Sequence, residues 1–423
     1  MRNLDKILNE RKDINGYLIT EKTEESFQLF FVKDRLETIR KTNVLDQKVM
    51  VYVSHDDFLG SFEFSVLASD TKASLAKKLD QAVYTAKLIN NKKFDLVKGE
   101  KSNHNLKSNI SKYDFKELGY EIYNVSREAI KETGGDINAL EIFINKNTEK
   151  VINSSGVNRK MQSYNIFVEA IPTWNGENES VELYEAISVS EFNKEALKEE
   201  LVESLNNVRA RYEAKKLDNL GKYDIVLTPS ENSMLFSDIS RILSYAALYQ
   251  HFNFYNLGDM VSESKKDKIN IKAKGSIKGS TNSRAFDQDG FLLTEKELVK
   301  DNKVVGFYGA NKFAQYVGMD ATGNLPCIEV KKGSLTDNEL AKIKHIECVS
   351  FSGLQVDLIS DYIGGEVRLG YLVENGERKP VTGFTISAKL SDVLNNIRLS
   401  NKDTVYRNYK GPKKVLLRNM NVL

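Results

Sequence analysis

The sequence contains few cysteines and few histidines, two of the first and four of the second among 423 residues. Cys327 and Cys348 are too few for a disulfide framework, so a reducing cytoplasm is the expected compartment. No apolar run approaches the roughly 20 residues that a membrane-spanning helix needs. The first residues, MRNLDKILNERKD, mix charges where a secretory signal would carry an apolar core. These absences predict a cytoplasmic protein with no membrane partner.

Neither sign of charge predominates, because 61 Lys and Arg residues face 59 Asp and Glu residues, for a formal net charge of +2. Such a balance creates no global field that would attract nucleic acid. Two basic runs, SKKDKINIKAKGSIK and YRNYKGPKK, interleave lysines with apolar or aromatic residues as a nucleic-acid groove would. Both runs are short, and solvated strand faces explain them better. We predict no nucleic-acid partner.

The chain exceeds the size of one ordinary core, so two domains are expected. Its 41% hydrophobic and 28% charged residues are those of a folded protein. Up to residue 219, helix-period segments alternate with strands that come mostly in hairpins; beyond it, short strands with Gly and Asn turns predominate. We predict an α+β fold, with an N-terminal α/β-type sheet-and-helix domain over 1–219 and a mainly antiparallel β domain over 220–423.

Periodicity also predicts individual elements. Helices are expected at 3–13, 71–90, 113–131, 193–216, 336–346 and 391–397, and strands at 16–20, 26–32, 36–39, 163–171 and 181–189. Residues 140–145 and 150–153 predict a hairpin, and the Lys-, Asn- and Ser-rich segment 91–112 predicts a surface loop. Asp289-Gly290 and Asn375-Gly376 predict hairpin turns, because these residues adopt positive φ easily.

The stretch 221–256, GKYDIVLTPSENSMLFSDISRILSYAALYQHFNFYN, is the most informative part of the second domain. It predicts a short strand, a break at Pro229, and a helix over 233–250 capped by Asn232 or Ser233. Apolar residues at helical spacing predict the buried face of that helix: Leu235, Ile239, Ile242, Leu243 and Ala246. A strand that turns sharply into a half-buried helix is a rigid place to mount catalytic groups.

Several segments, in their order along the chain, resemble the TldD/PmbA family. Residues 279–325 carry the most similar elements, which are Ser283, Arg284, Phe286, Asp287 and Gly290, then 303–306, then Thr322, Gly323 and Asn324. The tail 364–397 resembles the family's closing hairpin, 221–229 resembles the strand that enters its catalytic helix, and Asn-Ser-Ser-Gly at 153–156 resembles its Asn-Ser-x-Gly turn. The resemblance is weak over residues 1–130 and strong over 279–400.

This resemblance implies a two-domain α+β fold and a dimer that encloses an inner chamber. In the catalytic TldD-type subunit, a helix bears His-Glu-x-x-x-His and a Cys near the carboxyl terminus supplies a third zinc ligand. That arrangement leaves one zinc position for a water molecule, from which the Glu takes a proton during attack on a peptide carbonyl. PmbA-type (TldE) subunits lack these ligands and pair with the catalytic subunit. Such assemblies are associated with the cleavage of unfolded or modified peptides.

On the family helix, the metal-motif positions correspond to Ser237, Asp238 and Ile242, which cannot form a zinc pair. After Asp357 the chain has neither Cys nor His, so the third ligand is also missing. We therefore predict no catalytic residue and no metal in this chain, with zinc only in a TldD-like partner. Ser237 and Asp238 are better explained as a surface-facing polar pair than as a serine hydrolase, because no G-x-S-x-G turn surrounds them.

Other candidate sites have plainer explanations. His55, His104, His251 and His345 are scattered, although His345 and Cys348 with Cys327 could in principle bind a metal. A buried Cys348 on a strand and a His345 at the preceding helix end explain them better. Candidate peptide-binding or chamber residues are Asn153, Ser154, Gly156, Arg284 and Asp287, although structural turns account for most of them.

The leading functional prediction is a PmbA/TldE-like, non-catalytic subunit that pairs with a TldD-like chain and presents an extended peptide by strand addition. One alternative is a homodimeric peptide-binding or scaffold protein without a protease partner. Another is a peptidase with a remodelled site on the 233–250 helix. Whether the chain is itself an enzyme stays open at this point.

Overall fold

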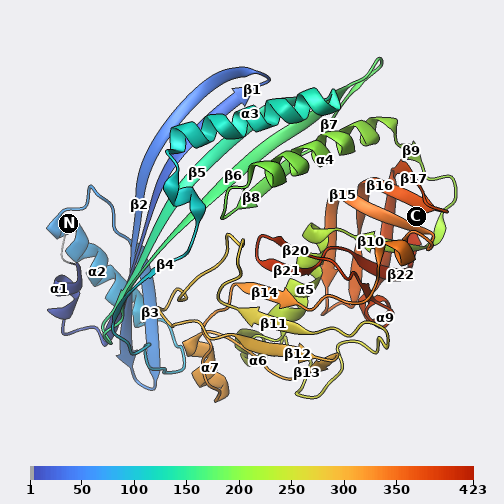
Figure 1. Cartoon of the computed structure of the whole chain (residues 1–423). Helices are drawn as coiled ribbons and strands as arrows, with labels where there is room; N and C mark the ends of the chain where they lie inside the picture. The colour runs from blue at the N-terminus through green and yellow to red at the C-terminus, as the bar shows by residue number, and fades with distance from the viewer. Residues whose placement is uncertain (1–3) are drawn as a thin grey trace.

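The first half of the protein is built on one long, strongly bent sheet (Figure 1). The computed structural model describes residues 4–423. The strands of this sheet are β1 (Gly16–Val32), β2 (Arg35–His55), β3 (Phe58–Ser65), β4 (Lys101–Asn105), β5 (Asp136–Asn153), β6 (Asn158–Asn175), β7 (Ser180–Glu182) and β8 (Glu185–Val189). They are ordered β3-β2-β1-β5-β6-β4, with β7 and β8 also paired to β6. All pairs are antiparallel except β4 with β6.

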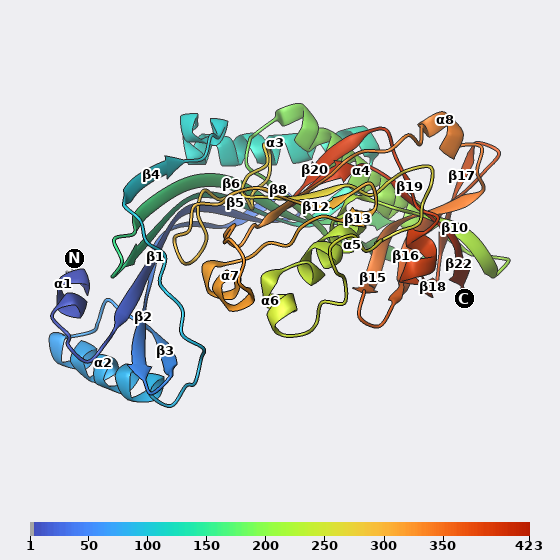
Figure 2. The ribbon, with the colours of Figure 1, turned by 90° about the horizontal axis from the view of Figure 1, so that it is seen from below.

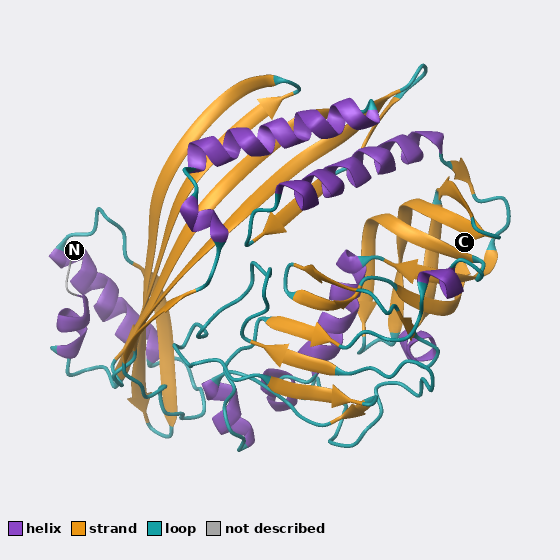
Figure 3. Cartoon of the chain, viewed as in Figure 1, coloured by secondary structure: helices purple, strands orange, loops and turns teal. Residues whose placement is uncertain are grey.

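Two pairs of helices cover this sheet in separate places (Figure 3). They are α1 (Leu4–Asn9) with α2 (Lys72–Ala86), and α3 (Phe115–Thr133) with α4 (Lys194–Glu213), the latter pair preceded by the 3-10 turn η1 (Asn109–Lys112). Strand β1 packs against both pairs of helices with the same face, because alternate residues of a strand lie on one face of the sheet. Ile19 lies in the core that α2 completes, and Leu29 and Phe31 lie in the core that α3 and α4 complete.

The second half contains two further sheets. One comprises β9 (Lys215–Lys216), β10 (Gly221–Leu227), β15 (His345–Asp357), β16 (Tyr362–Glu374), β17 (Glu377–Thr382), β18 (Phe384–Lys389), β19 (Arg398–Leu399) and β22 (Val415–Val422). The other comprises β11 (Ile271–Lys274), β12 (Lys296–Lys300), β13 (Lys303–Val304), β14 (Cys327–Val330), β20 (Asp403–Tyr406) and β21 (Tyr409–Pro412). In the first of these, β15, β10, β22, β18 and β16 bond in a closed ring. Most pairs are antiparallel, so the predicted α+β class is confirmed.

Helix α5 (Pro229–Ile242) lies between these two sheets and forms the centre of their shared core (Figure 3). Leu235, Ile239 and Ile242 are each 0% exposed, so the predicted apolar face is confirmed. The short helices α6 (Tyr245–Tyr249), α7 (Asn311–Val317), α8 (Asp337–Leu340) and α9 (Leu390–Leu394) complete this half. Figure 2 shows the amino-terminal helices and the carboxyl-terminal strands at opposite ends of the molecule. None of the helices within residues 4–423 is long and apolar enough to span a membrane.

The segment 284–290 joins the two halves. Phe286 is 0% exposed and lies in a cluster with Val151, Val157 and Met161 of the first half. Arg284 pairs with Glu149 of β5 in the same junction. This segment, in which the family resemblance is strong, is therefore an interdomain contact.

Two further contacts of the junction explain its sequence. Arg159 of β6 donates to the carbonyl oxygen of Gly290. Gly290 has a φ of 80° and no room for a side chain, because a Cβ there would lie 2.6 Å from Val157. The Asp289-Gly290 pair thus forms a tight turn against the first half, flanked by an antiparallel bridge between Phe286 and Leu292, within the long connection from β11 to β12.

The prediction of a surface loop over residues 91–112 is wrong in two respects. Residues 101–105 form strand β4 of the first sheet, and the segment before it is held by the second half. Asn311 and Gln315 of α7 both donate to the carbonyl oxygen of Asp95, at 2.7 and 2.9 Å, and the Asp95 N–H donates to Gln315 at 2.9 Å. Polar composition predicted exposure, but tertiary partners order this backbone.

Other differences concern element boundaries. The predicted hairpin over 140–153 is wrong, because β5 runs unbroken through 136–153 and turns only at Asn153–Gly156. The predicted strands 16–20 and 26–32 are one strand, β1. The charged residues between the two predicted strands do not interrupt β1, because both neighbouring strands pair with it there. Helix α8 ends at Leu340, well before the predicted 346, and the predicted 3–13 helix extends to residue 3, outside the described residues.

The start of α5 also differs from the prediction. Pro229 is the first helical residue and Thr228 is the N-cap, so Pro229 begins the helix. Proline suits this position because its fixed φ is helical and its missing N–H would have had no partner. Asn232, predicted as a cap, is 0% exposed and donates to the carbonyl oxygens of Pro412 and Lys413.

Candidate functional site

The helix predicted to carry degenerate catalytic positions is intact, and those positions are bonded into the scaffold. Ser237 Oγ accepts a hydrogen bond from Asn408 Nδ2 at 3.2 Å. Asp238 accepts one from the backbone N–H of Leu358 at 3.0 Å and pairs with Arg241. Ser237 and Asp238 are half-buried, so the prediction of a surface-facing polar pair is wrong. Loops that follow other strands bury them, which helical periodicity does not reveal.

The third motif position, Ile242, lies in the core at 0% exposure. An aliphatic side chain has no lone pair to offer a metal, and a hydroxyl with one carboxylate does not supply the ligands that a tetrahedral zinc site takes from a protein. The residues present on α5 therefore do not fit zinc. Within residues 4–423, no three His, Cys, Asp or Glu side chains gather in an arrangement suited to a metal ion.

The two cysteines and the buried histidine do not form a group of metal ligands within residues 4–423. His345 begins strand β15, not a helix end as predicted, and its Nδ1 lies 2.8 Å from the carbonyl oxygen of Ile343. Cys348 is 0% exposed on the same strand, where burial raises the pKa of its thiol well above the ordinary value. Cys327 lies on β14 with its Sγ 3.5 Å from Ser280 Oγ.

The candidate peptide-binding residues in the Asn-Ser-Ser-Gly turn hold the backbone of the junction. Asn153 is 5% exposed, and its side chain donates to the carbonyl oxygen of Val97 while accepting from Ser155 and Val157. Ser154 Oγ accepts from the backbone N–H of Tyr17, and Gly156 has a φ of 94°.

The candidates in the second half lie at the same junction. Asp287 is 1% exposed and accepts hydrogen bonds from the backbone N–H groups of Asp289, Phe291 and Asn324. Arg284, its neighbour in the motif, pairs with Glu149 as described above. None of the five predicted peptide-binding residues lines the large cavity described next.

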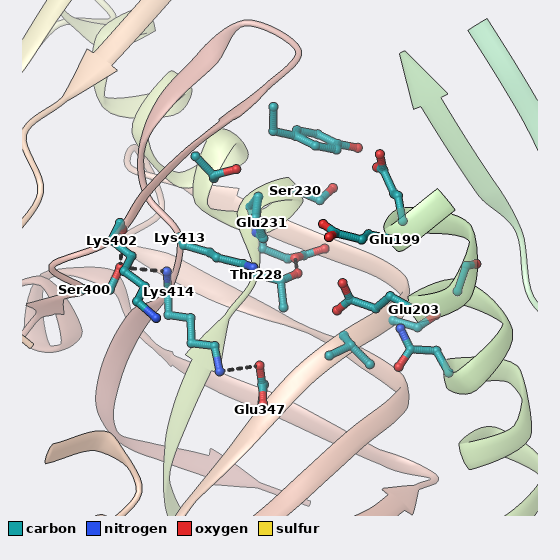
Figure 4. A pocket seen from close by; sticks show the side chains of 18 of the residues that line it. Glu199, Glu203, Thr228, Ser230, Glu231, Glu347, Ser400, Lys402, Lys413 and Lys414 are labelled. Carbon is teal, nitrogen blue, oxygen red and sulfur yellow. Dashed lines mark hydrogen bonds and ion pairs between the residues drawn. The ribbon is translucent and has the colours of Figure 1, made fainter. Parts of the chain in front are cut away.

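That cavity, with a volume of about 1070 Å³, lies between the two halves. One wall comes from β8 and α4 of the first half, and the other comes from the β10–α5 connection, β15, β20 and the end of β21 (Figure 4). Its size is at the upper end of the range for ligand pockets. Strands β8 and β20 both line it, and each is hydrogen-bonded to a single neighbouring strand, β6 and β21 respectively.

The two walls carry opposite charges (Figure 4). Carboxylates line the α4 side, from Glu185, Glu199, Glu200 and Glu203. Cations line the opposite side, from Arg378, Lys402, Arg407, Lys413 and Lys414. On the cationic side Lys414 Nζ lies 2.9 Å from Glu347, and Lys402 Nζ lies 2.7 Å from Asp337.

Burial and neighbouring charges shift the pKa of several carboxyl groups in the cavity. Desolvation, with added repulsion from Glu185 and Glu203, raises the pKa of Glu200 to about 7. Desolvation also raises the pKa of Glu185 and of Glu231. Burial alone would raise the pKa of Glu347, but the charges of Lys414 and Arg378 lower it overall.

Sequence reasoning missed these cavity residues. Glu199 and Glu203 are four residues apart on one helix, and like charges at this spacing destabilise a helix unless a cation lies near them. That spacing was a signal, but a weak one, because surface helices often carry several glutamates. The opposing lysines come from loops beside β20, β21 and β22, about 200 residues further along the chain, and no local pattern connects them with α4.

With this geometry established, comparison with known proteins identifies the fold. Residues 220–423 match the model of the PmbA/TldA metallopeptidase C-terminal domain. The second half of the chain therefore belongs to the TldD/PmbA family. No curated protein matches it by sequence.

Three solved structures share the fold of the whole chain. TldE from Thermococcus kodakarensis has a TM-score of 0.81 at 14% identity, with 99% of each chain covered. A Thermotoga maritima protein described as a candidate modulator of a DNA gyrase has a TM-score of 0.77 at 20% identity, with 96% of each chain covered. A Bacteroides thetaiotaomicron protein with a similar description has a TM-score of 0.78 at 17% identity, covering 99% of this chain and 96% of that one.

The crowding of carboxylates on α4 makes a testable prediction. Replacing Glu203→Gln should lower the pKa of Glu200 from about 7 toward its ordinary value, because one of its two repelling neighbours loses its charge. A carbon-13 NMR titration of the side-chain carboxyl groups measures this directly. Glu195→Gln, on the same helix but outside the cavity, is the control and should leave the titration unchanged. An unshifted Glu200 in the Glu203 variant would contradict the coupling.

Proposed function

We propose that this chain is the zinc-free subunit of a cytoplasmic TldD-type metallopeptidase, and that it pairs with a zinc-binding chain of the same family. One observation carries the proposal. Helix α5 keeps the strand, the proline start and the buried face of a catalytic platform, while its motif positions hold Ser237, Asp238 and Ile242. In this chain those three positions serve packing and hydrogen bonding.

The role of the subunit is to hold an extended, unfolded peptide in the interdomain cavity while its partner cleaves it. Strand β20 supports this role, because it lines the cavity and has a neighbouring strand on one side alone. An edge strand offers its unpaired backbone groups to an incoming chain whatever the side chains of that chain are. Strand β8 is less available, since the N–H of Ala186 already donates to its neighbour Glu185 at 3.2 Å.

The test compares the chain alone with the chain co-expressed with a family member from the same genome that contains His-Glu-x-x-x-His. We expect zinc, measured by elemental analysis, and cleavage of an unfolded peptide in the complex, and neither in the lone chain. Light scattering gives the stoichiometry of the complex. Stoichiometric zinc together with cleavage by the lone chain would contradict the proposal. The absence of such a partner gene would instead favour a homodimeric peptide-binding protein.

A remodelled site on α5 is tested within the same complex. Asp238→Asn keeps the shape of the side chain and its acceptor for Leu358, but it removes the charge that a general base needs. We expect unchanged cleavage by the complex. A loss of cleavage with normal assembly would mean that α5 of this chain takes part in the chemistry.

A further inference from the structure

The acidic wall of the cavity lacks counter-ions from the protein itself. Within residues 4–423, the cations of α4 pair away from the cavity: Lys194 lies 3.0 Å from Glu128, Lys198 lies 3.0 Å from Glu132, and Arg209 lies 2.9 Å from Glu213. Among the described residues, the four carboxylates of the wall, at positions 185, 199, 200 and 203, form no ion pair. The wall therefore gathers carboxyl groups that have no ion-pair partner in the described part of the protein.

A fifth carboxylate reaches the same space from the other half of the protein. Glu231, in the first turn of α5, is 8% exposed and points into the cavity (Figure 4). Its side-chain partner is the hydroxyl of Thr228, and it pairs with no Lys, Arg or His of the described chain. Burying more than nine-tenths of a carboxylate without a nearby cation costs free energy. A cationic ligand beside Glu231 would lower that cost.

Three of the five cations of the opposite wall already pair with carboxylates outside the acidic wall. Lys414 is occupied by Glu347, which also lies 3.3 Å from Arg378. Lys402 is occupied by Asp337. Within residues 4–423, Arg407 and Lys413 form no ion pair, and the charge of Arg407 offsets part of the rise that burial causes in the pKa of Glu185. No cation offsets the effect of burial on the pKa of Glu200 or Glu231.

These carboxylates suit an organic cation better than a metal ion. No three acidic, His or Cys side chains within residues 4–423 converge as a metal site would require. Ammonium and guanidinium groups need no such convergence, because each donates several hydrogen bonds that separate carboxylates can accept. Edge strand β20 on the facing side provides the backbone groups that a peptide, unlike a free amine, can use.

We infer that the cavity selects extended peptides with a Lys or Arg side chain, which lies against Glu200, Glu203 and Glu231 while the peptide backbone adds to β20. This inference rests on the proposed peptide-holding function and names its substrate class. Charged hydrogen bonds in a partly desolvated site contribute more than exposed ion pairs do. The Lys or Arg side chain of the peptide thus determines which peptides bind, and the edge of β20 determines how the peptide backbone is oriented.

The experiment measures binding by fluorescence anisotropy at physiological ionic strength. The probes are short fluorescein-labelled Gly/Ser/Ala peptides that differ only at two central residues: Lys, norleucine or Glu. We expect the Lys peptide to bind roughly tenfold more tightly than the norleucine peptide, and the Glu peptide to bind most weakly. In the double variant Glu200→Gln, Glu203→Gln, the Lys peptide should fall to the affinity of the norleucine peptide. Glu195→Gln, outside the cavity, is the matched control and should keep the full preference.

The outcomes separate this inference from the proposed function. Equal binding of all three peptides would leave the peptide-holding function in place and overturn the charge selection. No binding of any peptide, by the lone chain or by its complex, would overturn both. If spermidine alone bound as tightly as the Lys peptide, the backbone contribution of β20 would be refuted, and with it the assignment of a peptide. A preference that survived in the double variant would place the selecting residues elsewhere.

Discussion

Replacing Phe286→Ala is expected to destabilise the protein by about 3–5 kcal/mol, because it empties a fully buried site at the junction of the two halves. The ring lies in an apolar cluster with Val151, Val157 and Met161, and its centroid is 5.9 Å from that of His104. These neighbours belong to the first half, whereas Phe286 belongs to the second. The loss should therefore fall on the coupling between the halves.

Denaturant unfolding followed with probes in each half measures this coupling. In the variant we expect two separated transitions, because each half retains its own core while their contact is weakened. Phe286→Leu, which refills much of the space, should cost less. Phe252→Ala, at a residue that is 54% exposed, is the matched control and should change stability by no more than about 0.5 kcal/mol. A Phe286→Ala protein as stable as its parent would refute the role of this contact.

Replacing Asp267→Ala is the second large effect that we expect, about 3–5 kcal/mol, because it strands a buried cation. Asp267 Oδ2 accepts hydrogen bonds from Arg398 Nε at 2.6 Å and from the Leu399 N–H at 3.0 Å. Its Oδ1 accepts from the N–H and the hydroxyl of Ser334, at 2.7 and 2.8 Å. Asp267 is 3% exposed and Arg398 is 7% exposed, so water cannot replace the lost partner.

This carboxylate also predicts a pH dependence of stability. Burial alone would raise the pKa of Asp267, but its hydrogen bonds from Arg398, Ser334 and Leu399 lower it overall. A folded-state pKa below the unfolded value means that the stabilisation is present above the ordinary Asp pKa, and that it is lost as pH falls through the folded value. The parent protein should lose stability in acid by this route, and Asp267→Asn should lack that part of the loss.

Urea unfolding midpoints across a pH series provide the measurement. Asp337→Ala is the control. The ion pair of Asp337 with Lys402 is exposed, with side chains that are 56% and 66% accessible. Its loss should therefore lower the free energy of unfolding by no more than about 1 kcal/mol. The double variant Asp267→Ala, Arg398→Met should recover part of the stability, because no unpaired charge remains. If the single and double variants were equally unstable, lost packing rather than the stranded charge would be the cause.

The Asp267 cluster also matters for the cavity. Asp267 holds Ser334 against β19. Ser400 follows β19 directly in the chain. Its hydroxyl accepts a hydrogen bond from the Lys414 N–H at 3.1 Å and donates one to the Lys402 carbonyl oxygen at 2.7 Å. These bonds position the backbone that carries the cationic wall. The Asp267 variants should therefore weaken peptide binding together with stability, whereas the Glu200 and Glu203 variants should affect binding alone.

Local patterns sufficed for much of the fold, because short-range physics governs them. The apolar face of α5 follows from its 3.6-residue period, and the Asn375-Gly376 turn follows from the ease with which these residues adopt the positive φ angles of 55° and 81° found there. The family resemblance placed the metal-motif positions at Ser237, Asp238 and Ile242, and residue type alone shows that these side chains cannot form a zinc pair. The fold class and the missing metal motif thus follow from the amino-acid sequence by itself.

Tertiary contacts account for what the patterns could not show. Segment 91–99 is polar in sequence, yet its Asp95 backbone is held by Asn311 and Gln315, more than 200 residues away. Ser237 and Asp238 have helical spacing typical of a solvent face, yet loops around Asn408 and Leu358 bury them. The cavity is the clearest case, because its charge comes from α4, α5 and β20–β22 together. Charges at such separations in sequence interact only after the chain has folded, so their arrangement is a property of the tertiary structure alone.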